Sequence, residues 1–77
     1  MRFPSKDIVE KLRKEYPAGT RVELVRMDDA FAPPLGTIGT IEGVDDTGSL
    51  MVRWENGSGL NVIYGEDIVK KLPQKQP

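Results

Sequence analysis

The chain has 77 residues, with 11 Lys and Arg against 12 Asp and Glu, and it contains neither His nor Cys. A chain of this length is expected to form a single domain, residues 1–77, with one modest core. The missing residue types exclude a disulfide framework, a thiolate nucleophile, a Ser-His-Asp triad and zinc sites built from Cys or His. No stretch has the apolar length of a signal peptide or a spanning helix, so we expect a cytoplasmic protein without membrane contact.

The charge is near balance overall but unevenly distributed along the chain. Residues 1–27 hold seven basic and four acidic residues. Residues 28–69 hold one basic and eight acidic residues, and residues 70–77 hold three basic residues and no acidic one. A central part this acidic would repel phosphate backbones over most of its surface. Chance clustering on a solvated surface is the alternative interpretation.

The first element in chain order is expected to be a helix over about residues 5–16. Ser5 is a good N-cap, and Asp7 lies in the first turn, where the helix dipole favours an anion. One apolar stripe follows, formed by Ile8, Val9, Leu12 and Tyr16. Pro17 ends the pattern. So short a helix must dock on the rest of the domain to be stable.

Residues 20–72 then follow a β pattern, and residues 73–77 are expected to be a frayed tail. The expected strands are Arg21–Arg26, Thr37–Val44, Ser49–Glu55, Leu60–Tyr64 and Ile68–Leu72. Gly39 and Gly43 interrupt the second of these, which is typical of a bulge or a tight bend. The predicted core consists of Ile8, Leu12, Val22, Leu24, Ile41, Leu50, Val52, Trp54, Leu60, Val62 and Leu72.

The connections indicate the fold class. Residues 45–48 and 56–59 carry hairpin chemistry, residues 65–67 form a brief turn, and residues 27–36 form the longest irregular stretch. Five short strands with this order of connections predict a mainly β protein. We expect a small SH3-like five-stranded antiparallel barrel with an N-terminal α-helix. An OB-fold is the nearest alternative, but it normally needs longer strands.

The long loop and two aromatic residues supply the candidate binding surface. Long loops on small scaffolds often carry function, and no strand pattern explains Phe31. Trp54 and Tyr64 alternate in phase with core positions, so they either fill the core or line a groove. The loop itself is either a binding surface or a cover over one end of the barrel. The candidate binding residues are Asp28, Asp29, Phe31, Pro33, Pro34, Trp54, Asn61 and Tyr64.

No pattern in the sequence predicts catalysis, a metal site or a cofactor. The pairs Asp28-Asp29 and Asp45-Asp46 do not lie in a calcium-loop pattern, and the second pair has the chemistry of a turn. The glycines of residues 36–39 do not follow a strand and open a helix, so they do not form a phosphate loop. We therefore expect a protein that is not an enzyme and that carries no cofactor.

Several separated motifs, in the same order, resemble a known family. They are residues 16–24 with 27–29, residues 33–37, 44–46 and 52–58, Asn61-Val62 and residues 64–67. Over roughly residues 4–72 the chain is similar to family 4314 of the domains of unknown function, seen in bacteria and their phages. The resemblance implies no established activity, while phage occurrence implies an accessory or anti-defence role. Residues 36–39 and 52–54 resemble, more loosely, SH3-like modules of the KOW and Mib–HERC kinds, which bears on fold alone.

Together these observations favour a non-catalytic binding module whose partner is a protein. The first alternative is an anti-defence protein that sequesters a small nucleotide signal in a pocket between the subunits of a homo-oligomer. The second is nucleic-acid binding through the basic helix with Lys11, Arg13 and Lys14, which the acidic centre disfavours.

Overall fold

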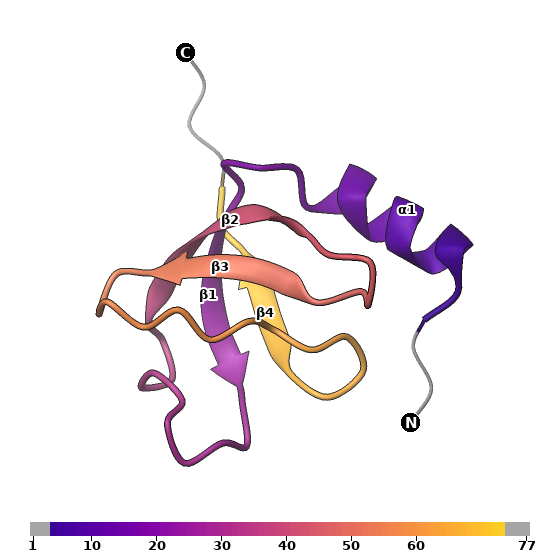
Figure 1. Cartoon of the computed structure of the whole chain (residues 1–77). Helices are drawn as coiled ribbons and strands as arrows, with labels where there is room; N and C mark the ends of the chain where they lie inside the picture. Colours follow the sequence, from indigo (N-terminus) through magenta and orange to yellow (C-terminus); the bar gives the residue numbers. More distant parts are fainter. Residues whose placement is uncertain (1–3, 74–77) are drawn as a thin grey trace.

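The computed structural model describes residues 4–73; residues 1–3 and 74–77, which include most of the predicted tail, lie outside the described residues. The helix α1 (Lys6–Glu15) precedes the strands β1 (Arg21–Arg26), β2 (Ile38–Val44), β3 (Leu50–Trp54) and β4 (Ile68–Lys71) (Figure 1). Within the described range, no helix is long and apolar enough to cross a membrane.

Helix α1 forms where the capping and stripe pattern predicted it. The Ser5 hydroxyl accepts a hydrogen bond from the Ile8 backbone N–H at 3.3 Å, so Ser5 is the N-cap. The helix ends before Pro17, one residue earlier than expected. Val9 and Leu12 are its buried residues, and they dock the helix on the core.

The four strands form one antiparallel sheet in the order β3-β2-β1-β4. Strands β3 and β4 are consecutive in the chain but lie at opposite edges of the sheet, so residues 55–67 must cross from one edge to the other (Figure 1). The crossing segment covers the inner face, where Val62 is buried at 3% exposure.

The prediction of a closed five-stranded barrel is wrong, because residues 60–64 do not form a strand. Only Val62 pairs with β3, through two backbone hydrogen bonds of 2.8 and 2.9 Å with Leu50. The Leu60 carbonyl instead accepts a hydrogen bond from the Trp54 indole at 2.9 Å. The Ile63 N–H donates to the Asp67 carboxylate at 2.8 Å. Side chains thus take the backbone groups that a fifth strand would need, and the sheet stays open.

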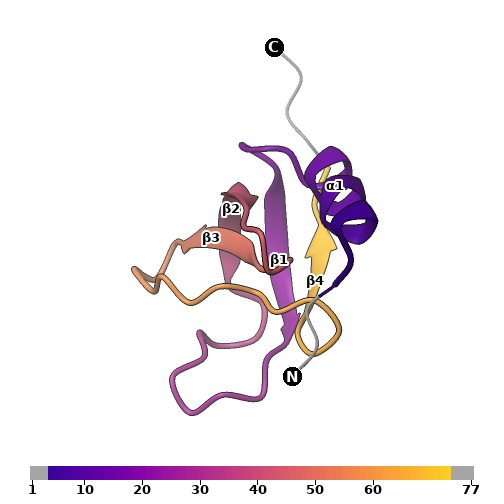
Figure 2. The ribbon, with the colours of Figure 1, turned by 45° about the vertical axis from the view of Figure 1, so that its right-hand side comes forward.

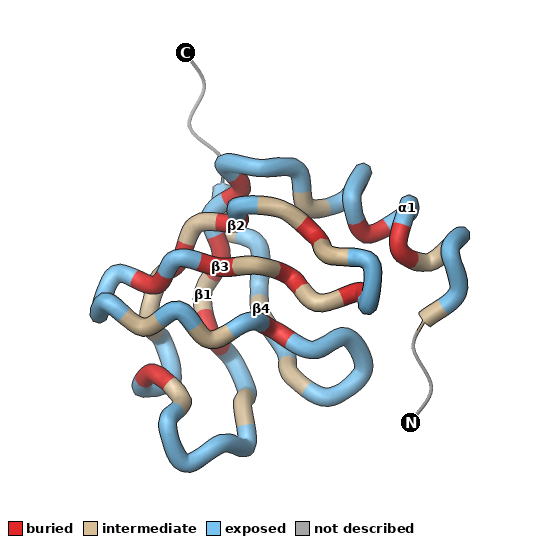
Figure 3. Tube along the Cα trace, in the orientation of Figure 1, coloured by how far each residue is buried: buried red, intermediate tan, exposed pale blue. Residues whose placement is uncertain are grey.

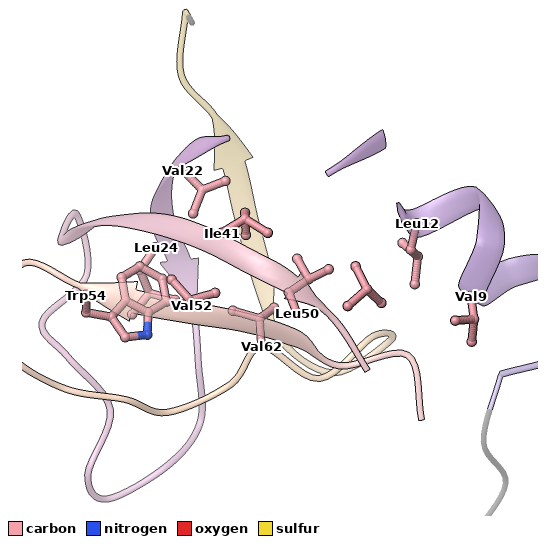
Figure 4. Packing of buried hydrophobic residues seen from close by; sticks show 10 residues of the cluster. Val9, Leu12, Val22, Leu24, Ile41, Leu50, Val52, Trp54 and Val62 are labelled. Atoms are coloured by element: carbon pink, nitrogen blue, oxygen red, sulfur yellow. The ribbon is translucent and has the colours of Figure 1, made fainter. Parts of the chain in front are cut away.

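The core lies between the sheet, the crossing segment and α1. Figure 4 shows Trp54 at one end of the buried cluster and Val9 with Leu12 at the other. Eight of the eleven predicted core residues are buried. Ile8, Leu60 and Leu72 are only partly buried, whereas Val9 and Val44, which were not predicted, belong to the core.

Gly39 and Gly43 have different roles within β2. The register between β2 and β3 shifts between Ile41 and Gly43, so a bulge lies where the sequence predicted one. A Cβ atom at Gly39 would lie 2.6 Å from Val52 Cγ1 and 2.7 Å from Trp54 Cε3. Gly39 therefore allows the indole to lie directly against β2.

Candidate functional site

The loop between β1 and β2 projects beyond the sheet at the end away from α1 (Figures 1 and 2). Its two ends are joined, because the Gly36 N–H donates to the Leu24 carbonyl at 2.8 Å and the Leu24 N–H donates to the Thr37 carbonyl at 2.9 Å. Its tip is ordered by the Asp29 carboxylate, which accepts a hydrogen bond from the Phe31 N–H at 2.7 Å. These bonds hold the loop in one shape.

The same loop presents apolar side chains to solvent. Phe31 is 83% exposed and Leu35 is 67% exposed. Pro33 is buried and Pro34 is exposed. Most of the loop is exposed along its length (Figure 3). The Phe31 side chain therefore does not pack against the domain as a cover over the end of the sheet would require, and the choice between cover and binding surface stays a prediction for mutation to test.

A cleft of about 690 Å³ lies at the base of this loop. It forms because the register pairs Arg26 of β1 with Ile68 of β4, which brings residues 27–29 beside residues 65–67. We call it the acidic cleft. Its lining residues are Arg26, Met27, Asp28, Asp29, Ser49, Leu60, Asn61, Ile63, Gly65, Glu66, Asp67 and Ile68.

Four acidic residues line the acidic cleft, namely Asp28, Asp29, Glu66 and Asp67, whereas Arg26 is the only basic residue of its lining in the part of the chain that the structure describes. The carboxylates are spread out: within residues 4–73 no three acidic side chains lie close enough together to hold a metal ion. The cleft therefore presents a diffuse negative field to whatever enters it.

A second cavity, of about 310 Å³, adjoins the first between α1 and the crossing segment. We call it the apolar groove. Its lining residues are Leu12, Glu15, Tyr16, Gly48, Leu50, Val62, Tyr64, Gly65, Asp67, Ile68 and Val69. Burial, followed by the charge of the neighbouring Glu15 carboxylate, raises the pKa of the Tyr16 phenol. The ammonium of Lys71 lies 5.3 Å from the centre of the Tyr16 ring, a cation–π contact.

Residues 5–72 match the sequence model of a protein family described as "Domain of unknown function (DUF4314)". The chain belongs to this family. No curated protein matches the chain.

In this DUF4314 chain the predicted candidates fall into separate groups. Asp28, Asp29 and Asn61 line the acidic cleft, and Tyr64, which is 49% exposed, lines the apolar groove. Phe31, Pro33 and Pro34 belong to the loop outside both linings. Trp54 is 2% exposed, so it fills the core and does not present its ring in a groove.

Sequence reasoning missed the other side of the acidic cleft. Glu66 and Asp67 were predicted only as part of a turn, and Arg26 only as a strand residue. Their position depends on the pairing of β1 with β4. If the first and last strands pair antiparallel, the residues after the first strand and those before the last strand lie at the same end of the sheet. This assumption would have placed Asp28-Asp29 beside Glu66-Asp67.

The pair Asp45-Asp46 has a structural role in the β2–β3 hairpin. The Asp45 carboxylate accepts hydrogen bonds from the Thr47 hydroxyl at 2.7 Å and the Ser49 N–H at 2.9 Å. The hydroxyl bond is the largest cause of a lowered Asp45 pKa, followed by the backbone bonds. Asp46 pairs with Arg13 of α1 at 2.9 Å. Turn chemistry, as predicted for this pair, is confirmed.

Proposed function

We propose that this chain is a non-catalytic module that binds a protein partner through the loop of residues 27–36 and the acidic cleft at its base. One observation carries the proposal: Phe31 is 83% exposed on a loop that internal hydrogen bonds hold in one shape. Exposed aromatic side chains are frequent energetic anchors of interfaces. A loop that is already ordered loses less conformational entropy on binding.

The charges of the acidic cleft support a partner with a positively charged surface. Four acidic residues and one basic residue line it, so an approaching basic segment is attracted and an acidic one is repelled. The same charges argue against an anionic lipid surface as the partner of the loop. Within this proposal, the partner belongs to the cytoplasm of a bacterium, where an accessory or phage-encoded protein would meet it.

The alternatives receive less support from the geometry. A nucleotide signal would place phosphates among the acidic residues of the acidic cleft, where Arg26 is the only basic residue among the described residues of the lining. In the basic helix, the Arg13 guanidinium donates to the Val44 carbonyl at 3.1 Å and pairs with Asp46 at 2.9 Å. Arg13 therefore serves to dock the helix, which leaves fewer cations to contact a nucleic acid.

The proposal is tested by capture of a partner from a bacterial lysate with the wild-type chain and with Phe31→Ala. Because the Phe31 side chain is exposed, the variant is expected to melt within about 2 °C of wild type. We expect it to lose the captured partner. A matched control is Val25→Ala, since Val25 is 43% exposed on β1 and lines neither cavity.

Equal capture by wild type and Phe31→Ala would contradict the proposal. In parallel, a thermal-shift screen with nucleotides, cyclic nucleotides and duplex DNA tests the alternatives, since a bound ligand raises the melting temperature. A shift with a nucleotide, together with loss of that shift in Arg26→Ala, would favour sequestration over protein binding.

A further inference from the structure

The acidic cleft and the apolar groove lie side by side, because Gly65, Asp67 and Ile68 line both cavities. We call the two cavities together the depression. The groove reaches down to side chains of the buried core, namely Leu12, Leu50 and Val62. At its rim, Tyr64 and Ile68 are each 49% exposed. Apolar surface is thus open to solvent directly beside the acidic cleft.

Both walls of the apolar groove are fixed before anything binds. On the helix side, Arg13 ties α1 to the β2–β3 hairpin through the Val44 carbonyl at 3.1 Å. On the other side, the two backbone hydrogen bonds between Leu50 and Val62 hold the crossing segment. The groove is therefore formed in advance, as small binding pockets usually are.

Three exposed apolar side chains lie at these two cavities, whereas Phe31 and Leu35 lie in the loop outside both linings. Ile63, Tyr64 and Ile68 are between 47% and 49% exposed, and each lines one cavity or both. The outer face of the sheet differs, since it carries the ion pairs Arg21–Glu55 and Arg53–Glu42. The depression combines apolar surface with negative charge, whereas the outer face combines charges of both signs.

We propose that the depression binds an extended peptide segment of the partner, with a basic side chain in the acidic cleft and a bulky apolar side chain in the apolar groove. This inference rests on the proposed function. Charge complementarity supports it: among the lining residues that fall within residues 4–73, Arg26 is the only basic one, and the acidic ones are Glu15, Asp28, Asp29, Glu66 and Asp67. Ten extended residues span about 33 Å. The longest dimension of the molecule is 37 Å, so one such peptide reaches both cavities.

The test is selection of ten-residue peptides from a random library displayed on phage, with the full chain as bait. We expect the selected peptides to share a basic residue and a bulky apolar residue at a fixed spacing. In a synthetic peptide of the consensus sequence, replacing the apolar residue by Ala should weaken binding about tenfold or more. Raising the salt concentration should weaken binding through the basic residue.

A matched pair of variants tests the apolar contact at Ile68, which lines both cavities. Ile68→Thr removes apolar surface from the groove, whereas Val25→Thr makes a similar change outside both cavities. Both positions are partly exposed in strands and both replacements are β-branched, so the fold should survive, which melting curves check. We expect Ile68→Thr to weaken binding several-fold with its salt dependence unchanged, and Val25→Thr to have no effect.

The remaining outcomes overturn the inference. One is the selection of basic peptides that share no apolar residue, and another is an equal affinity of Ile68→Thr and Val25→Thr for the consensus peptide. The third is a dimer of the wild-type chain in sedimentation that Ile68→Thr abolishes, since this result would place a second copy of the chain in the groove. Failure to select any peptide would overturn it too. The proposed function would still stand if Phe31→Ala abolished capture, since that assay also detects folded partners without an extended segment.

Discussion

The close approach of Trp54 to β2 makes Gly39→Ala the sharpest test of the packing. The new methyl group would lie 2.6 Å from Val52 Cγ1 and 2.7 Å from Trp54 Cε3. Carbon atoms pack best at about 3.5–4.0 Å, so about 1 Å of movement is required. Both neighbours are buried, at 3% and 2% exposure, and the hydrogen bond to the Leu60 carbonyl restrains the indole.

Overpacking of this kind costs about 1–3 kcal/mol. For a domain of this size, that lowers the melting temperature by about 5–20 °C. The assay is thermal unfolding followed by far-ultraviolet circular dichroism and by the fluorescence of Trp54. Gly59→Ala is the matched control, because its added methyl group meets nothing within 4 Å and its φ is not positive. If Gly39→Ala melted together with this control, the packing of the indole against β2 would be refuted.

Three further predictions concern stability. Leu50→Ala should cost about 2–5 kcal/mol in urea denaturation, because Leu50 is 5% exposed; an unchanged midpoint would contradict its place in the core. Trp54→Phe should cost about 1–3 kcal/mol in the same assay, since it leaves the Leu60 carbonyl without its donor. The Asp45 carboxylate, whose pKa is lowered chiefly by Thr47, stabilises the fold above about pH 4 and loses this effect as the pH falls. The gap in melting temperature between wild type and Asp45→Ala should therefore shrink from pH 7 to pH 3, and a constant gap would contradict that role.

The local elements could be predicted because short-range chemistry determines them. Ser5 caps the helix, alternation identifies the four strands within one residue at each end, and Asp45 orders its hairpin. Each of these features depends on residues that are near one another in sequence. The core could also be largely predicted, since Val22, Leu24 and their neighbours follow the alternation.

The features that sequence reasoning missed depend on contacts between distant residues. The alternation of Leu60, Val62 and Tyr64 matches a strand, but the Trp54 indole and the Asp67 carboxylate take the backbone groups of this segment. The acidic cleft arises from the pairing of β1 with β4, which periodicity does not show. The position of the loop between β1 and β2 was predicted correctly, whereas the residues that lie opposite it across the acidic cleft were not predicted.

That pairing also determines when the two cavities form during folding. Strand β1 is synthesised early, yet its residue Val22 pairs with Lys71 of β4, which is synthesised much later. A nascent chain can therefore form α1 and the β2–β3 hairpin while β1 still lacks its second neighbour. Sheets closed by such distant partners fold on the scale of milliseconds to seconds. Neither cavity is complete until this last strand docks, since Ile68 lines both of them. A ribosome-bound chain that lacks β4 would therefore present only an incomplete form of both cavities.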